Sequence, residues 1–170
     1  GVFIPFVHLV PYALDHHIDH SAAVLLLGAI GVGSTFGRFF LADLADRIGR
    51  QVFLLMMFAG MALALAIWAI ATDFWSLAAF ALIFGVFYGG WVAILPAVVM
   101  DCFGGRYVGS IIGILYTSVA IGTLIGPAAA GFIFDASNSY TVPILTSTIA
   151  NLVATGIAAL ALRSPTQRGV

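Results

Sequence analysis

The position of Arg38 makes it the residue most suggestive of a binding site. It lies near the end of an apolar stretch that is otherwise uncharged. A guanidinium at membrane depth costs at least about 2.5–3.5 kcal/mol on insertion scales, so it normally faces a protein interior or a watery cavity. Its planar fork of donors matches a carboxylate. The residues alone leave two interpretations open: an anion site, or a side chain that reaches nearby water from the end of a helix.

Three other kinds of side chain are candidates for contact with a ligand. His8 and Tyr12 are four residues apart, so on a helix they share a face. Histidine titrates near neutral pH, which makes His8 a candidate ligand for substrate or proton. The alternative is a buried histidine that is hydrogen-bonded to a neighbouring helix. Tyr88 and Tyr116 are candidates for the wall of a cavity, although packing or a lipid-facing position would also explain them.

A histidine cluster raises the question of a metal. His16 and His20 would share a helix face, and His17 lies beside them. A solvated loop explains the same three residues. The single Cys102 excludes a disulfide framework and a thiolate cage. The sequence contains no nucleophile–base constellation, phosphate loop or pair of buried carboxylates, so we expect neither an enzyme nor a bound metal or cofactor.

Residues 42–51 place five notable residues in one tight turn. Asp43 and Asp46 leave one apolar stretch, Arg47 and Arg50 open the next, and Gly49 gives the backbone freedom between them. We expect a gating loop in which Asp46 faces the N-terminus of another helix and is held by its dipole. The alternative is a plain cluster of charges at the membrane surface.

Composition identifies the environment in which these residues work. The chain has 170 residues, of which 62% are hydrophobic and 8% charged, and its mean hydropathy is +1.15. One soluble domain of this length cannot bury so much apolar surface. The sequence lacks the basic patch that a nucleic-acid binder would need, and its net charge of −1 says nothing about partners. An integral membrane protein remains.

Continuous apolar stretches predict membrane-spanning helices, because about 20 such residues cross the hydrocarbon core. The first stretch is too short, and with Gly1 at the start it is expected to be a helix whose beginning is missing. The expected architecture is one all-α transmembrane unit, residues 1–170, with a partial helix at 1–15 and helices at about 22–42, 52–71, 75–100, 108–134 and 140–162.

Glycine and proline shape the expected helices. Gly33 and Gly37 have the spacing that lets two helices approach closely. We expect kinks at Pro96 and at Gly126-Pro127, because a proline removes one backbone hydrogen bond and strains the preceding turn.

The arginines predict the orientation of the chain. After five crossings, Arg47, Arg50, Arg106, Arg163 and Arg168 fall on one side, and Asp15, Asp19, Asp73 and Asp135 on the other. Basic loops face the cytoplasm. We therefore expect a multi-pass protein of the plasma (cell inner) membrane with a cytoplasmic C-terminus.

Taken together, these features resemble the C-terminal half of a major facilitator superfamily transporter. Residues 42–51 are similar to that superfamily's loop signature, Gly-x-Leu-Ala-Asp-Arg-x-Gly-Arg-Arg, with Ala42 and Gln51 as departures. More narrowly, the chain resembles the monocarboxylate transporter and oxalate/formate antiporter group. The residues that carry this resemblance are Pro5 to Leu9, Tyr12-Ala13, Gly37-Arg38, Phe84-Gly85, Gly89, Pro96, Asp101, Gly104, Gly126-Pro127, Gly131 and Asp135.

The resemblance implies twelve helices in two halves, of which this chain would supply the end of the seventh and helices eight to twelve. It implies that Arg38 pairs with the carboxylate of a small organic anion. Relatives that couple transport to protons often place Asp one turn earlier, where this chain has Ser34. The expected partners are the anion, with or without a coupled proton, the lipid bilayer and the missing six-helix half. The expected substrate-binding set is Arg38, His8, Tyr12, Ser34, Tyr88 and Tyr116.

Secondary transport of small monocarboxylates or related organic anions is therefore the leading functional expectation. An organic-anion exchanger without proton coupling is the alternative within transport. A metal-dependent membrane enzyme would rest only on His16, His17 and His20. A sensor or assembly subunit is a third class, and it would not need an anion site at Arg38.

Overall fold

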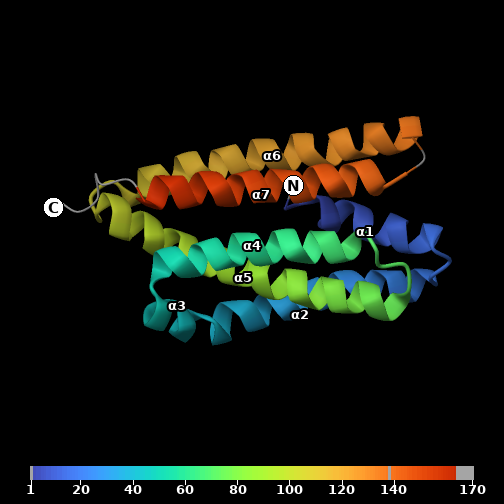
Figure 1. Cartoon of the computed structure of the whole chain (residues 1–170), viewed down its shortest axis with the longest axis horizontal. Coiled ribbons are helices and arrows are strands. Elements are labelled where there is room, and N and C mark those ends of the chain that lie inside the picture. The colour runs from blue at the N-terminus through green and yellow to red at the C-terminus, as the bar shows by residue number, and fades with distance from the viewer. Residues whose placement is uncertain (1, 138, 164–170) are drawn as a thin grey trace.

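The chain is a bundle of long helices joined by short loops, as the computed structural model in Figure 1 shows. The structure describes residues 2–137 and 139–163. Five helices in these ranges are long and apolar enough to cross a membrane. The expectation of an all-α membrane protein is confirmed. The helices are α1 (Ile4–Asp15), α2 (His20–Phe40), α3 (Ala42–Ile48), α4 (Arg50–Trp68), α5 (Phe74–Phe103), α6 (Val108–Ser137) and α7 (Thr141–Arg163).

Successive long helices run in opposite directions, so alternate loops gather at the same end of the bundle (Figure 1). One end holds α3 and the loop between α5 and α6, with Arg47, Arg50 and Arg106, and we name it the arginine end. The other end holds the loops after α1, α4 and α6. We name it the aspartate end, after Asp15, Asp19, Asp73 and Asp135. Arg168 lies outside the described residues.

Two of these aspartates begin helices. Asp19 is the N-cap of α2 and accepts a hydrogen bond from the backbone N–H of Ser21 at 3.0 Å. Asp73 is the N-cap of α5 and forms a capping box with Ser76. Hydrogen bonds from Ser76 hold the pKa of the Asp73 carboxyl below its usual range. Capping satisfies N–H groups that have no partner within a helix, which explains why short acidic side chains stand here.

The closest helix contact joins α2 to α5, and glycine makes it possible. A Cβ atom on Gly33 or Gly37 would overlap the backbone of α5, at Leu82 and Val86 respectively. Residues without side chains let two helix backbones approach closely in lipid. The spacing of Gly33 and Gly37 therefore serves the contact of α2 with α5.

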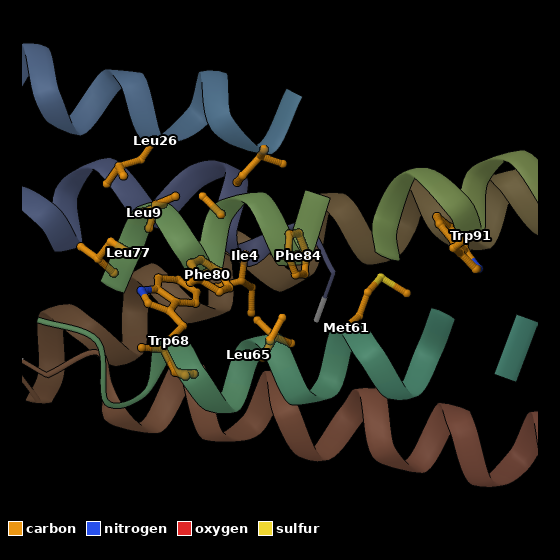
Figure 2. Packing of buried hydrophobic residues seen from close by; sticks show 14 of the residues in the cluster. Ile4, Leu9, Leu26, Met61, Leu65, Trp68, Leu77, Phe80, Phe84 and Trp91 are labelled. Carbon is orange, nitrogen blue, oxygen red and sulfur yellow. The ribbon is translucent and has the colours of Figure 1, made fainter. Parts of the chain in front are cut away.

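A core of large side chains lies between α1, α4 and α5 (Figure 2). Trp68 of α4 is fully buried, and its ring stacks on Phe80 of α5 with centroids 5.2 Å apart. Leu9 of α1 and Leu65 of α4 are also fully buried. This core fixes the position of the short helix α1 against the two long helices.

Helix α6 is covered least by the rest of the chain. None of its most apolar window is buried, whereas half of the corresponding window of α4 is. Leu124 is 78% exposed and Phe132 is 77% exposed. Apolar surface of this extent is not stable in water. Lipid or helices from outside this chain must cover it.

The segment 42–51 differs from the tight turn expected from the sequence. Residues 42–48 form the two-turn helix α3, and only Gly49 is non-helical before α4 begins. Gly49 has φ of +92°, a conformation that L side chains rarely adopt. The Asp43–Arg47 pair, four residues apart, stabilises a helical turn that the Gly-containing pattern did not reveal.

Both prolines expected to kink helices lie inside continuous helices. Pro96 is within α5 and Pro127 is within α6. Each lacks the N–H that would bond to the carbonyl four residues earlier. The kinks themselves, with Gly126 beside Pro127, stay predictions.

Candidate functional site

Arg38 lies in the last turn of α2, toward the arginine end, and its side chain is exposed on the surface of this chain. No described residue forms an ion pair or hydrogen bond with its guanidinium. The other described arginines differ, since Arg47 and Arg50 pair with carboxylates and Arg106 lies over the ring of Tyr107. Within the described chain, Arg38 therefore has all five of its donors available.

One of the predicted tyrosines, Tyr88, lies near Arg38, and the other, Tyr116, lies near Tyr88. Tyr88 of α5 is close enough to both Arg38 and Tyr116 for a direct electrostatic interaction. Tyr88 is half-buried, and its ring packs edge-on against Phe6 of α1 with centroids 5.2 Å apart. Tyr116 of α6 is 40% exposed. Tyr88 thus lies between a guanidinium on α2 and a second phenol on α6.

Ser34 lies one turn before Arg38 on the same side of α2, and it is buried. A Cβ atom on Gly89 of α5 would overlap the backbone carbonyl of Ser34. The position therefore serves the close approach of α2 and α5. Its predicted contact with substrate stays a prediction.

His8 is buried and bonds to a neighbouring helix, as one of its two sequence interpretations expected. Its Nε2 lies 3.0 Å from the backbone oxygen of Pro127 in α6, so the imidazole donates to this carbonyl when Nε2 carries the proton. Its ring also lies near Tyr140, with centroids 5.8 Å apart. A Cβ atom on Gly131 would come within 3.9 Å of the imidazole Cε1. The ring therefore fits closely against α6.

Tyr12 is buried at the aspartate end and holds a loop in place. Its hydroxyl donates to the backbone oxygen of Ala71 at 2.8 Å. Its ring packs against His16, Trp68 and Tyr140, with centroid distances of 4.3, 5.6 and 5.5 Å. These contacts join α1 to the segment between α4 and α5 and to the start of α7.

The predicted substrate set therefore falls into two groups. Arg38 is 18 residues along α2 from His20, which is roughly 27 Å at 1.5 Å per residue. Tyr12 is three residues from Asp15, at the opposite end of the bundle. Tyr88 connects Arg38 of α2 to Tyr116 of α6, and Ser34 lies one turn before Arg38 on α2. His8 and Tyr12 belong to the packing near the aspartate end.

The gating-loop residues form two separate groups of ion pairs, one of which reaches α5. Arg47 pairs with Asp43 at 2.8 Å. The Arg50 Nε lies 3.3 Å from Asp46, and its Nη1 lies 3.1 Å from Asp101 at the arginine end of α5. Arg50 therefore links α3 to α5.

Asp101 is the member of this cluster that sequence reasoning missed as a site residue. It lies 51 residues from Arg50, so no local spacing connects them. The available signal was charge balance, because Asp101 is a carboxylate at the end of the bundle that collects arginines. Asp46 has Arg50 as its partner in the described structure, and 68% of its side chain is exposed. Its predicted contact with a helix N-terminus stays a prediction.

The histidine cluster contributes one local contact. The Nδ1 of His16 lies 2.8 Å from the backbone oxygen of Tyr12. His17 has φ of +60° and turns the chain after α1. Within residues 2–137 and 139–163, no three His, Cys, Asp or Glu side chains are grouped so that they could hold a metal ion.

Comparison with known proteins places this arrangement in a family. The model of the Major Facilitator Superfamily matches residues 1–170, which is the whole chain. The chain is also similar to curated transporters from animals and fungi.

Three relatives illustrate the range. "Monocarboxylate transporter 12-B" of Danio rerio is 35% identical over 146 residues, which make 83% of this chain and 30% of that protein. "Aspyridones efflux protein apdF" of Emericella nidulans is 30% identical over 136 residues, 79% of this chain and 28% of that protein. "MFS-type transporter opdF" of Penicillium oxalicum is 31% identical over 166 residues, 96% of this chain and 39% of that protein. The chain thus spans between about a quarter and two fifths of these relatives.

Proposed function

Because this chain belongs to the Major Facilitator Superfamily, we propose that it is part of a secondary transporter of small monocarboxylates or related organic anions. Relatives named monocarboxylate transporters support the substrate class. The chain covers about 30% of the first of them, so the remaining helices of the transporter would lie outside it. The uncovered faces of α2 and α6 are where those helices would pack.

The observation that carries this proposal is the unpaired guanidinium of Arg38 near Tyr88, which in turn lies near Tyr116. A carboxylate would accept two parallel hydrogen bonds from the guanidinium, as planar anions commonly do. The phenol hydroxyls would donate to the same anion or to its α-substituent. Small-molecule sites typically have a mostly apolar lining with a small number of polar groups that orient the ligand.

Transport would follow from rocking of this half against the other around the site. We propose that the ion pairs of Asp46, Arg50 and Asp101 stabilise one of the two states at the arginine end. In that state, a helix N-terminus from the other half would approach the exposed Asp46 carboxylate. Alternating access of this kind is typical of transporters built from repeated halves. The proposal includes no catalysis and no cofactor.

The orientation is part of the proposal. The five apolar helices and the family show that the described chain is a multi-pass membrane protein. We propose that the arginine end and the C-terminus face the cytoplasm and that the membrane is the plasma (cell inner) membrane, because basic loops are retained on the cytoplasmic side.

Exchange of one organic anion for another, without a proton, is the second candidate. The observation that favours it is the absence of a carboxylate partner for Arg38 among the described residues. Ser34 stands where the proton-coupled pattern often places Asp, and a serine hydroxyl neither takes up nor releases a proton near neutral pH. A counter-anion in the lumen of proteoliposomes would accelerate uptake by an exchanger.

Uptake by arginine variants of the complete transporter tests the proposal. Arg38→Lys keeps the charge but loses the planar pair of donors, so uptake of labelled organic acids should fall at least tenfold per molecule of protein in the membrane. Arg38→Ala should reduce uptake at least as much. Arg47→Lys is the matched control, because Arg47 is an exposed arginine at the same end whose partner is Asp43.

The outcome separates two roles for Arg38. If the Arg38→Lys transporter takes up substrate like the Arg47→Lys control, the guanidinium geometry is irrelevant. Arg38 is then an anchor at the membrane surface, since lysine reaches the interface equally well.

A further inference from the structure

A pocket lies at the aspartate end, far along the bundle from Arg38. Its volume is about 330 Å³, and its walls come from the end of α1, the loop before α5, the end of α6 and the start of α7. The proposed transport mechanism does not use it. The lining residues that matter here are Tyr12, Asp15, His16, Phe134, Tyr140 and Thr141.

Tyr140 is the first indication that this pocket binds a ligand. The residue is only 8% exposed, and no described residue forms a hydrogen bond with its hydroxyl. Packing holds this tyrosine in place while no described residue uses its hydroxyl donor, so the donor is available to a ligand in the pocket. Burial and the nearby Asp15 and Asp135 carboxylates raise the pKa of Tyr140, which keeps its proton in place.

The charge of the pocket favours a cation. Asp15 lines it and has no ion-pair partner among the described residues. Asp135 lies close enough to Tyr140 to act on it electrostatically. No arginine stands at this end of the described bundle, and the sequence contains no lysine. His16 uses Nδ1 toward the Tyr12 carbonyl, which leaves Nε2 as an acceptor when the ring is neutral.

The aromatic rings favour an organic cation over a metal ion. Phe134 stacks on Tyr140 with centroids 4.2 Å apart, and Tyr12 packs edge-on against Tyr140 at 5.5 Å. Aromatic rings beside a carboxylate are the usual surroundings of a bound organic ammonium group. The described residues bring together no three His, Cys, Asp or Glu side chains that would hold a metal.

We propose that this pocket binds an organic ammonium group, through the Asp15 carboxylate, the Tyr140 hydroxyl and the aromatic rings around them. The group would belong either to a free amine or to the choline or ethanolamine headgroup of a lipid, since the pocket lies where spanning helices end. Its occupant would connect α1 to the hairpin formed by α6 and α7. This inference does not depend on the transported substrate.

The test measures thermal unfolding of the complete transporter in a maltoside detergent, which carries no ammonium group. Tetramethylammonium chloride is titrated against sodium chloride at equal ionic strength. A ligand that binds only the folded state raises the unfolding midpoint as its concentration passes the dissociation constant. We expect a saturable rise with tetramethylammonium and none with sodium.

Three variants locate the effect. Asp15→Asn should weaken the apparent affinity for tetramethylammonium at least tenfold, and Tyr140→Phe should weaken it severalfold. Asp19→Asn is the control, because it removes one carboxylate at the same end while asparagine still caps α2. It should bind like the wild type.

Nanodiscs distinguish the two sources of the group. If the ligand is a lipid headgroup, tetramethylammonium should stabilise the protein in phosphatidylglycerol discs but not in phosphatidylcholine discs, where the pocket is already filled. If the ligand is a free amine, the effect should be equal in both.

Two results would overturn the proposal. One is a wild-type protein that responds to tetramethylammonium no more than to sodium. The other is an Asp15→Asn protein that responds like Asp19→Asn, which would reduce the effect to the general charge of this end.

Discussion

The imidazole Nε2 of His8 lies 3.0 Å from the backbone oxygen of Pro127, and this contact joins α1 to the proline-containing part of α6. Helix α6 has few other contacts that hold it, since none of its most apolar window is buried in this chain. The hydrogen bond therefore holds α6 at Pro127, a residue that has no N–H to donate within the helix.

We predict that His8→Leu destabilises the protein without changing its affinity for substrate. The lost hydrogen bond is worth about 0.5–1.5 kcal/mol, so the thermal midpoint of the purified complete transporter should fall. His8→Gln can still donate to Pro127 and should recover part of the loss. The KM for uptake should stay within about twofold of wild type, because the His8 hydrogen bond stabilises the fold and makes no contact with the substrate. A large rise in KM with an unchanged midpoint would instead place His8 at the substrate.

We predict that transport is slower when the ion pairs of Arg50 are broken. Asp101→Asn and Asp46→Asn each remove one carboxylate from the Arg50 guanidinium. Each should reduce the maximal uptake rate severalfold and leave KM unchanged. The reason is that these pairs do not include Arg38, so they change the balance of the two transport states and not the contact with substrate. Initial rates in proteoliposomes measure this effect.

Asp43→Asn is the control for that experiment, since Asp43 pairs with Arg47 and not with Arg50. It should transport at the wild-type rate. Equal rates for all three variants would remove the gating role from Arg50 and its partners.

Close packing of α2 and α5 predicts that Gly89→Ala is destabilising. The added Cβ would overlap the Ser34 backbone, and forced overpacking costs typically about 1–3 kcal/mol. The thermal midpoint should fall, and uptake should fall with it, because Ser34 and Arg38 would shift together. Gly156→Ala in α7 is the control, as its added Cβ has no neighbour within 4 Å in this chain. Equal midpoints for the two variants would show that α2 and α5 have room to separate.

Arginine distribution predicts the topology. A reporter inserted after Asp46 should read cytoplasmic, and one inserted after Thr72 should read external. The two positions lie at opposite ends of α4. Reporters that read the same side would contradict the assignment of α4 as one membrane crossing.

The sequence by itself determined the membrane environment, the helical class and the family. Five apolar stretches of membrane length, separated by short polar segments, leave the backbone no alternative to helices, because lipid offers it no hydrogen bonds. Segment 42–51 carried the superfamily resemblance that the match over residues 1–170 confirms. Arg38 stood out because a charge is costly at membrane depth. These are local properties, readable from composition and spacing.

Only the tertiary structure decided which of the candidate residues share a region. It brought Tyr88 close to both Arg38 and Tyr116, and it joined His8 to Pro127, 119 residues away in the chain. It also gave Arg50 a second carboxylate at Asp101. The physical reason is that helix periodicity fixes the direction of a side chain on its own helix, but not which helix it meets. That choice depends on where glycine lets two backbones approach, as Gly89 does against Ser34.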